Sequence, residues 1–185
     1  MNRLFVSLNL PDEVIDKIVQ IRDSIYSDKN LKWEPKEKLH LTLKFIGDVP
    51  FNIVDEISKE LVLVNKYTEF NCSFFKFGFF YRDDNPNILW AGLKTDNYLN
   101  DLVTELNQKL KRFSIPTEKR KFNAHITLLR IKKELGINFV NKFKNFTFEP
   151  IEFTANNIVL YKSILLNKGS KYFKINNYKL KRMEM

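Results

Sequence analysis

The two histidines of the chain lie in the same four-residue pattern, His-x-Thr-Leu. His40 and Thr42 occur in "LHLTLKFIG", and His125 and Thr127 occur 85 residues later in "AHITLLR". A single histidine on a strand is more often structural than catalytic. However, the chain has only eight threonines among 185 residues, so a chance match at one histidine is expected about once in a few hundred cases. Two matches out of two indicate a shared chemical task.

That task is predicted to be acid–base chemistry at a phosphate. Histidine titrates near pH 6.5, so a neutral ring accepts a proton while a protonated partner donates one. A threonine hydroxyl donates to a phosphate oxygen as negative charge develops there. In-line cleavage of a P–O bond by such groups needs no covalent intermediate, and we expect neither a metal nor a cofactor. Catalytic zinc normally takes three protein ligands, and the sequence has no third histidine.

Both patterns are predicted to lie on β-strands, where successive side chains point to opposite faces. His40 and Thr42 then share one face, and Leu41 points into the core. The second pattern repeats this arrangement with His125 and Thr127. Two such strands side by side would form a cleft that two imidazoles and two hydroxyls line.

The surrounding sequence predicts an α+β domain spanning residues 1–185, because no Ser/Gly-rich linker divides the chain. Alternating apolar residues predict strands at 3–9, 40–47, 69–80, 87–93, 124–130, 146–153, 156–165 and 171–176. Helical spacing predicts helices at 10–26, 50–65 and 96–113, with a weak helix broken by Gly136. Each half of the chain thus offers a helix, a motif strand, another helix and paired strands, which suggests an ancient duplication.

Composition and charge limit the classes of protein. No apolar run approaches the ~18 residues of a membrane span, the start has no signal-peptide pattern, and Cys72 is the one cysteine, so we expect a cytoplasmic protein. Residues 1–100 carry 13 basic and 15 acidic side chains, whereas residues 101–185 carry 18 and 7. This asymmetry favours a phosphate-bearing partner such as RNA. A lysine-rich solvated surface is an equal alternative on composition alone.

The paired motifs resemble those of the two-histidine (2H) phosphoesterase superfamily, and the chain is most similar to its RNA 2′,3′-cyclic phosphodiesterase (2′-5′ RNA ligase-like) family. "RLFVSLNLP", "LHLTLKFIGDV", "NILWAGL", "HITLLR" and "VLYKSILLNKGSKYFKI" carry the resemblance. The resemblance implies a bilobal fold, in which two pseudo-duplicated lobes of antiparallel sheet are flanked by helices and enclose the active-site cleft. It also implies hydrolysis of a terminal 2′,3′-cyclic phosphate to a 2′-phosphate.

By this resemblance, His40 is the proton donor, His125 is the proton acceptor, and Thr42 and Thr127 complete the catalytic set. Phe45 matches a family aromatic that stacks on a base, and Arg130 matches an arginine that neutralises phosphate. Strict strand alternation places Phe45 and Arg130 on the faces opposite their histidines. Core packing for Phe45 and a structural ion pair for Arg130 therefore stay open, unless the strands twist or bulge.

The expected partner is RNA with a 2′,3′-cyclic phosphate end, tRNA-derived ends included, and the expected state is a monomer without membrane contact. The basic second half predicts that RNA leaves the cleft over a C-terminal lobe. The candidate RNA-binding residues are Lys119, Arg120, Lys121, Lys168 and Lys171. Three alternatives stay open: 2′-5′ RNA ligation as the reverse reaction, action on a small cyclic nucleotide, and a non-catalytic RNA-binding module.

Overall fold

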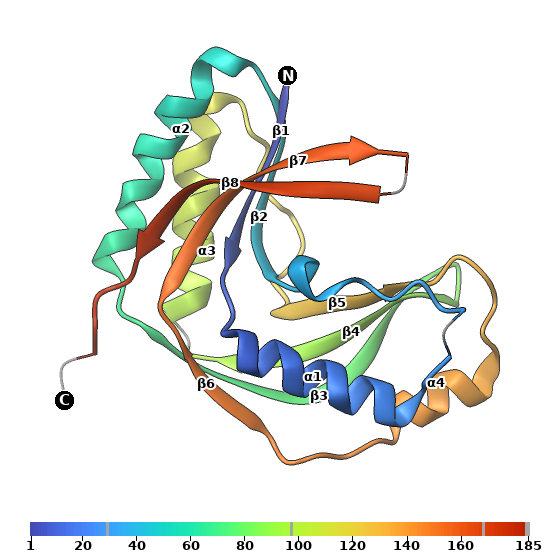
Figure 1. The fold of residues 1–185 in the computed structure, drawn as a ribbon. Helices are drawn as coiled ribbons and strands as arrows, with labels where there is room; N and C mark the ends of the chain where they lie inside the picture. The colour runs from blue at the N-terminus through green and yellow to red at the C-terminus, as the bar shows by residue number, and fades with distance from the viewer. Residues whose placement is uncertain (29, 97, 168, 184–185) are drawn as a thin grey trace.

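The computed structural model describes residues 1–28, 30–96, 98–167 and 169–183, and eight strands form one curled antiparallel sheet there (Figure 1). The strands are β1 (Asn2–Leu8), β2 (Leu41–Val49), β3 (Phe70–Arg82), β4 (Asn85–Thr95), β5 (His125–Arg130), β6 (Ile151–Ala155), β7 (Asn157–Leu166) and β8 (Gly169–Lys179). Their order across the sheet is β6-β3-β4-β5-β2-β1-β7-β8.

The sheet consists of two halves that meet at its centre. We call β2, β1, β7 and β8 the first lobe, and β5, β4, β3 and β6 the second lobe. Within each lobe the strands pair over many residues, but β2 and β5 pair only through Leu41 and Ile126. The expected α+β fold with two lobes is confirmed. The two motif strands are the strands that join the lobes.

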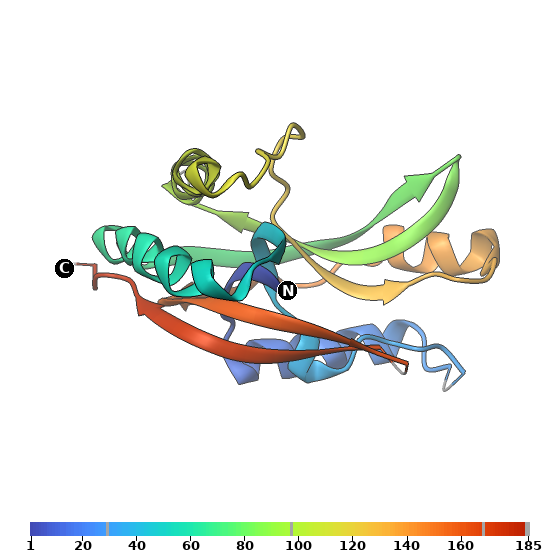
Figure 2. The same cartoon turned by 90° about the horizontal axis from the view of Figure 1, so that it is seen from above.

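Helices cover one face of each lobe with their apolar sides. The helices are α1 (Asp12–Ile25), α2 (Val54–Glu60), α3 (Tyr98–Leu110) and α4 (Gly136–Lys144). Helices α2 and α3 lie side by side with the first lobe, and α3 contacts β2 (Figures 1 and 2). Helices α1 and α4 belong with the second lobe, where α1 contacts β6 and α4 contacts β3. Burial of these apolar faces is the main driving force that packs the helices on the sheet.

The lobes do not coincide with the two halves of the sequence. Strands β3 and β4, from the first half, extend the second lobe, and β7 and β8, from the second half, extend the first lobe. The basic segment 101–185 is therefore divided between both lobes. We expected RNA to leave the cleft over a C-terminal lobe. In the described part of the chain, neither lobe is built from residues 101–185 alone, so the lobe that this expectation assumed does not exist.

Several predicted elements differ from the structure. The helix predicted at 50–65 is an α-helix only over α2, with 3₁₀ turns at Phe51–Ile53 and Leu61–Lys66. Gly136 starts α4 rather than breaking it, because its φ of +70° suits the turn that leads into the helix. The predicted strand at 146–153 is a strand only from Ile151 to Ala155. Phe146 and Phe148 precede this strand, and their partly buried side chains pack on the core although their backbone is not in a strand. Across the described residues, we find no helix with the length and apolarity that a membrane span requires.

Candidate active site

The two histidines lie at the junction of the lobes. His40 immediately precedes β2, and His125 is the first residue of β5. The residues that follow them, Leu41 and Ile126, are fully buried and form the one register pair between β2 and β5. Leu41 and Ile126 therefore anchor the two histidines on either side of the contact between β2 and β5.

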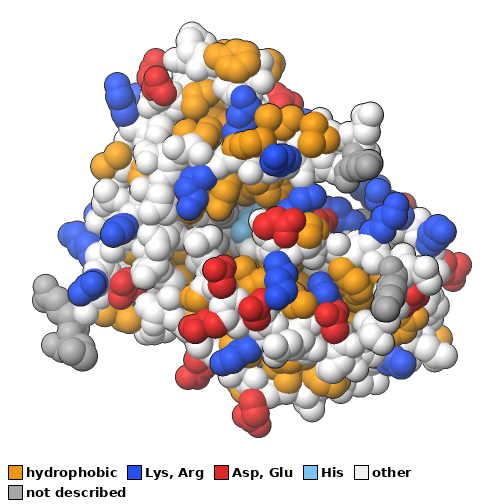
Figure 3. All heavy atoms as spheres, viewed as in Figure 1, with side chains coloured by type: hydrophobic (Ala, Val, Ile, Leu, Met, Phe, Trp, Pro, Cys, Tyr) orange, Lys and Arg blue, Asp and Glu red, His pale blue; other side chains and the backbone are white. Residues whose placement is uncertain are grey.

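Each motif keeps its threonine on the histidine side of the strand. Thr42 and Thr127 are partly exposed, whereas the intervening residues are buried. A hollow lies between the lobes on the face shown in Figure 3, and a histidine side chain is visible at its bottom. The expected alternation, with His and Thr outward and apolar residues inward, holds within both tetrads.

Both imidazoles are held by the same backbone contact. Nδ1 of His40 donates to the carbonyl oxygen of Lys38 at 2.7 Å, and Nδ1 of His125 donates to that of Asn123 at 2.7 Å. A carbonyl oxygen only accepts, so each Nδ1 carries hydrogen. The neutral ring then has its free lone pair on Nε2, which is the nitrogen available for proton transfer.

The surroundings favour the neutral form of both rings. Burial, together with the positive charge of Arg130, lowers the pKa of His40 from 6.5 to about 4. Burial and Arg130 also lower the pKa of His125. The hydrogen bonds to the carbonyls oppose these shifts without reversing them. Before an anion binds, both histidines are therefore bases near neutral pH.

Aromatic side chains form the walls beside the histidines. The His40 ring stacks on Phe5 with centroids 4.9 Å apart and meets Tyr172 edge-on at 5.4 Å. The His125 ring meets Phe80 edge-on at 4.7 Å and Trp90 at 6.4 Å. These contacts restrict the rotation of both imidazoles and explain part of the desolvation.

Two glycines make room for the tryptophan beside His125. A Cβ atom on Gly78 would lie 2.3 Å from the Trp90 ring, and one on Gly92 would lie 2.8 Å from it. Both distances are shorter than a van der Waals contact allows. A side chain at either position would displace Trp90 and, with it, the wall of the His125 site.

A β-bulge follows the threonine in both motif strands. In β2, Thr42 pairs with Ser7 and Lys44 pairs with Val6, so Leu43 is an extra residue. In β5, Thr127 pairs with Trp90 and Leu129 pairs with Leu89, so Leu128 is an extra residue. Each bulge shifts the side-chain alternation of the following residues by one position. The two bulges fall on the leucine of the two tetrads.

The bulges turn Phe45 and Arg130 towards the histidine side of the sheet. Each of the two is the fifth residue after its histidine. Phe45 is 68% exposed and lies 6.2 Å from Phe5, centroid to centroid, so its expected alternative of core packing is wrong. Arg130 makes an ion pair with Glu34, from its Nε to Oε1 at 3.3 Å. It also lies near enough to lower the pKa of both histidines.

The proposed RNA-binding residues fall in two places. Lys119, Arg120 and Lys121 are exposed in the segment that precedes β5, and Arg120 forms a 3.7 Å ion pair with Glu118. Lys171 is exposed on β8, next to Tyr172 and therefore on the opposite face of the hairpin. Lys168 lies outside the described residues.

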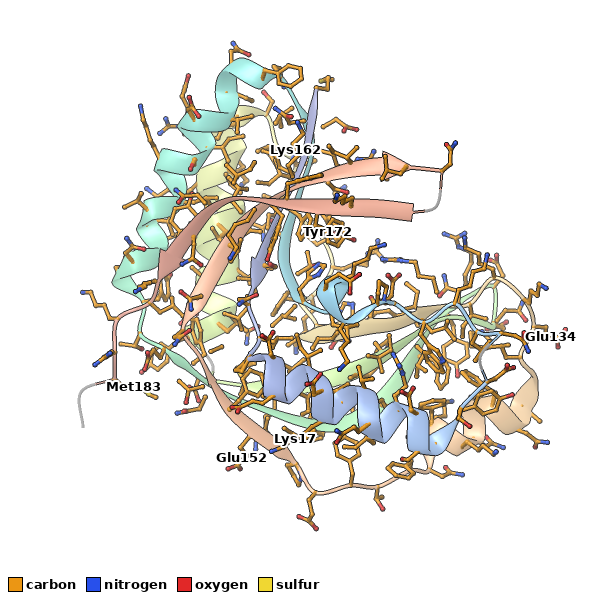
Figure 4. All side chains as sticks on the ribbon, in the orientation of Figure 1. Lys17, Glu134, Glu152, Lys162, Tyr172 and Met183 are labelled. Carbon is orange, nitrogen blue, oxygen red and sulfur yellow. The ribbon has the colours of Figure 1, made fainter. Side chains whose placement is uncertain are left out.

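Figure 4 shows the two faces of the β7–β8 hairpin. Tyr172 lies on the side that faces the second lobe, and Lys162 lies on the outer side. The structure therefore does not bring Lys171 together with the histidines. Its charge lies beside Phe173, 5.2 Å from the ring centroid, on the outer face.

Sequence reasoning missed several residues around the histidines. Phe5, Phe80 and Tyr172 come from other strands, and Glu34 comes from the segment before β2. Alternation in the predicted strand at 3–9 places Phe5 on one face, but it does not show that this face meets His40. The others depend on which strands become neighbours, and spacing within one strand carries no such information.

A cavity of about 440 Å³ lies beside His40 on the side of α1. Leu10, Leu39, Tyr161 and Tyr172 line its apolar part, and Asp12 and Glu37 line its polar part. Its volume is within the range of small-molecule sites. Among the described residues, no group of three or more His, Cys, Asp or Glu side chains is arranged to hold a metal ion.

Comparison with known proteins gives one family. The family model described as "LigT like Phosphoesterase" matches residues 8–90 and 93–172. An Archaeoglobus fulgidus protein named RNA 2′,3′-cyclic phosphodiesterase is 30% identical over 172 residues, which cover 92% of this chain and 96% of that protein. A Thermotoga maritima protein of the same name is 28% identical over 172 residues, covering 92% and 91%.

Solved structures share the fold. A Thermus thermophilus protein superposes with a TM-score of 0.80 at 23% identity, covering 98% of this chain and all of that one. Escherichia coli LigT in complex with 3′-AMP superposes with a TM-score of 0.78 at 23% identity, covering 97% and 98%. At this identity, the superpositions establish the shared architecture.

Proposed function

Because the chain belongs to the LigT-like phosphoesterase family, we propose that it is an RNA 2′,3′-cyclic phosphodiesterase. The observation that carries the proposal is the pair of imidazoles at the lobe junction, each tethered through Nδ1 with Nε2 free. One pair of proton-transfer groups is what in-line opening of a cyclic phosphate requires.

In the proposed reaction, Nε2 of His125 takes a proton from water as its oxygen attacks phosphorus. The bond from phosphorus to the 3′-oxygen breaks, and His40 protonates that oxygen as it leaves. The product is a 2′-phosphomonoester with a free 3′-hydroxyl. Solvent then returns the two histidines to their starting protonation states.

His40 must acquire a proton before it acts as the acid. Its lowered pKa of about 4 makes it neutral near pH 7 in the free protein. A phosphate anion attracts the imidazolium and offsets the charge of Arg130, so it raises this pKa on binding. The general acid therefore forms in the complex with substrate, which couples proton uptake to anion binding.

The residues around the histidines have supporting roles in the proposal. Thr42 and Thr127 donate hydrogen bonds to non-bridging phosphate oxygens. Arg130 neutralises the phosphate, and exposed Phe45 stacks on the terminal base. The exposed cations Lys119, Arg120 and Lys121 contact the phosphates upstream of the RNA end.

We further propose that the protein acts as a cytoplasmic monomer on cellular RNA ends, tRNA-derived ends included. Cys72 is buried, and burial raises the pKa of its thiol to about 12. An inert buried thiol suits a reducing compartment.

An oligoribonucleotide that ends in a 2′,3′-cyclic phosphate tests the proposal. The protein, in EDTA, should convert it to the 2′-phosphate, which mass spectrometry and resistance to 3′-phosphatase identify. His40→Ala protein prepared in parallel is the control for contaminating nucleases. RNA with a 5′-hydroxyl in the same tube reports ligation. Binding without any product, or activity only after metal is added, would overturn the proposal.

A further inference from the structure

The segment before the first motif is fixed against the second motif strand. Trp33 forms an isolated β-bridge with Leu129, and the backbone nitrogen of Glu34 donates to the carbonyl oxygen of Leu128 at 2.9 Å. Leu128 is the bulge residue of β5. The backbone of Glu34 therefore has a defined position beside the strand that carries His125.

Packing around Trp33 holds this position. The guanidinium of Arg22 lies 4.7 Å from the Trp33 ring centroid, and Phe143 lies 6.1 Å from it. These groups come from α1 and α4, so Trp33 is a contact between the segment and the second lobe. The carboxylate of Glu34 extends from this anchor to the guanidinium of Arg130.

The carboxylate lies beside the cleft of the histidines, because its ion-pair partner Arg130 is on the histidine side of β5. Glu34 is 22% exposed at its side chain and pairs with Arg130, which lowers the pKa of both His40 and His125. Tyr172 reaches the cluster from β8: burial raises the pKa of its phenol, Glu34 raises it further and Arg130 lowers it. An acidic group thus lies next to the cation that the proposed function assigns to the phosphate.

We propose that Glu34 makes the site discriminate by charge, binding a monoanionic phosphodiester in preference to a dianionic phosphomonoester. The inference rests on the proposed function, in which the substrate is a monoanion and the product a dianion. Repulsion from a fixed carboxylate grows in proportion to the charge on the ligand. Glu34 therefore weakens the product about twice as strongly, in free energy, as the substrate, which promotes product release.

A merely structural role for Glu34 predicts the opposite result. If the carboxylate only orients Arg130, its loss frees the guanidinium and weakens both anions. If it repels bound phosphate, its loss tightens both anions, and the dianion more. The two roles are therefore distinguished by the sign of the change and by its dependence on ligand charge.

The test compares Glu34→Gln with wild type by calorimetry near pH 7.5, using two ligands that lack the neighbouring hydroxyl and so cannot form a cyclic phosphate. These ligands are 3′-deoxyadenosine 2′-monophosphate, a dianion, and its methyl ester, a monoanion. We expect Glu34→Gln to tighten the dianion about tenfold and the monoanion about threefold. Glu60→Gln is the matched control, because Glu60 is 16% exposed and pairs with an arginine, Arg112, that is 59% exposed, compared with 56% for Arg130.

Glu60→Gln should leave both affinities unchanged. Equal tightening of the two ligands, weakening of either, or no binding of the dianion to Glu34→Gln would overturn the inference. The proposed function is tested separately, by the opening of the cyclic phosphate. If the cyclic phosphate is not opened and the dianion still tightens selectively, the charge discrimination holds and the hydrolase proposal fails.

Discussion

The first and second lobes repeat one backbone arrangement around different side chains. In each lobe a histidine is tethered through Nδ1 to the carbonyl two residues before it, at 2.7 Å, and a bulge follows at the fourth residue of the tetrad. The walls differ. His40 lies between Phe5 and Tyr172, whereas His125 lies beside Phe80 and Trp90.

The largest difference is at the fifth residue after each histidine. The bulge turns Phe45 outward in the first lobe and Arg130 in the second, so equivalent positions present an aromatic ring and a cation. The comparison shows how two lobes with the same backbone arrangement yield an asymmetric site. The backbone fixes where the side chain of the fifth residue points. The residue type at that position then decides whether the lobe presents an aromatic ring, as at Phe45, or a positive charge, as at Arg130.

Removing either imidazole should have the largest effect. His40→Ala and His125→Ala should each lower kcat on a nucleoside 2′,3′-cyclic phosphate by about 10²–10⁴-fold, because each removes one proton-transfer group. Steady-state kinetics measure the loss, and circular dichroism checks that the fold is retained. Near-normal turnover in either variant would show that the two lobes do not share the chemistry.

Replacing the charged fifth residue should have the next largest effect. Arg130→Gln should lower kcat/KM by about 10–100-fold through loss of charge-assisted contacts to phosphate. It should also move the pH optimum of kcat/KM upward. Arg130 lowers the pKa of both histidines, so its removal raises both values, and the singly protonated pair is then populated at higher pH.

In the wild type, the pH optimum of kcat/KM should lie below pH 6.5, because both pKa values are lowered from that value. The pH–rate profiles of wild type and Arg130→Gln test both statements. A downward move of the optimum in the variant would mean that Arg130 does not act electrostatically on the histidines.

The aromatic fifth residue should contribute less. Phe45→Leu removes the ring and keeps an apolar side chain, and it should weaken binding by about 1 kcal/mol, or about fivefold in KM, if a base stacks there. Because kcat depends on the histidines, it should change little. A loss confined to kcat would place Phe45 in positioning the chemistry rather than in holding the base.

The smallest effect is expected from the surface cations before β5. Changing Lys119, Arg120 and Lys121 together to Gln should flatten the slope of log affinity for long RNA against log salt by about 2, at about 0.7 per phosphate on a single strand. Hydrolysis of a mononucleoside cyclic phosphate should be unaffected. Equal losses on both substrates would assign these residues to the fold or to the site.

The sequence predicted those parts of the site that depend on a single strand. Alternation within each tetrad correctly placed His40 with Thr42 and His125 with Thr127, because both motifs are straight over those residues. It failed immediately afterwards, at Leu43 and Leu128, because a bulge depends on the register with the neighbouring strand. The faces of Phe45 and Arg130 were therefore beyond strict alternation.

The arrangement of the lobes shows a second limit. The paired strands that follow each motif were predicted as elements, but not that β3 and β4 join the second lobe while β7 and β8 join the first. Local patterns specify elements, and their partners depend on packing between distant segments. Tyr172 reaches His40 through the pairing of β7 with β1, and Glu34 reaches Arg130 through the bridge of Trp33 to Leu129.

A cyclic substrate in which sulfur replaces the bridging 3′-oxygen tests the central claim of distinct roles for the two histidines. A thiolate leaves without protonation, so the general acid becomes dispensable while the general base does not. The prediction is that His40→Ala regains most of the wild-type rate on the sulfur substrate, whereas His125→Ala retains its full defect. Rescue of His125→Ala instead would reverse the roles, and equal defects in both variants would contradict a division of acid and base between the lobes.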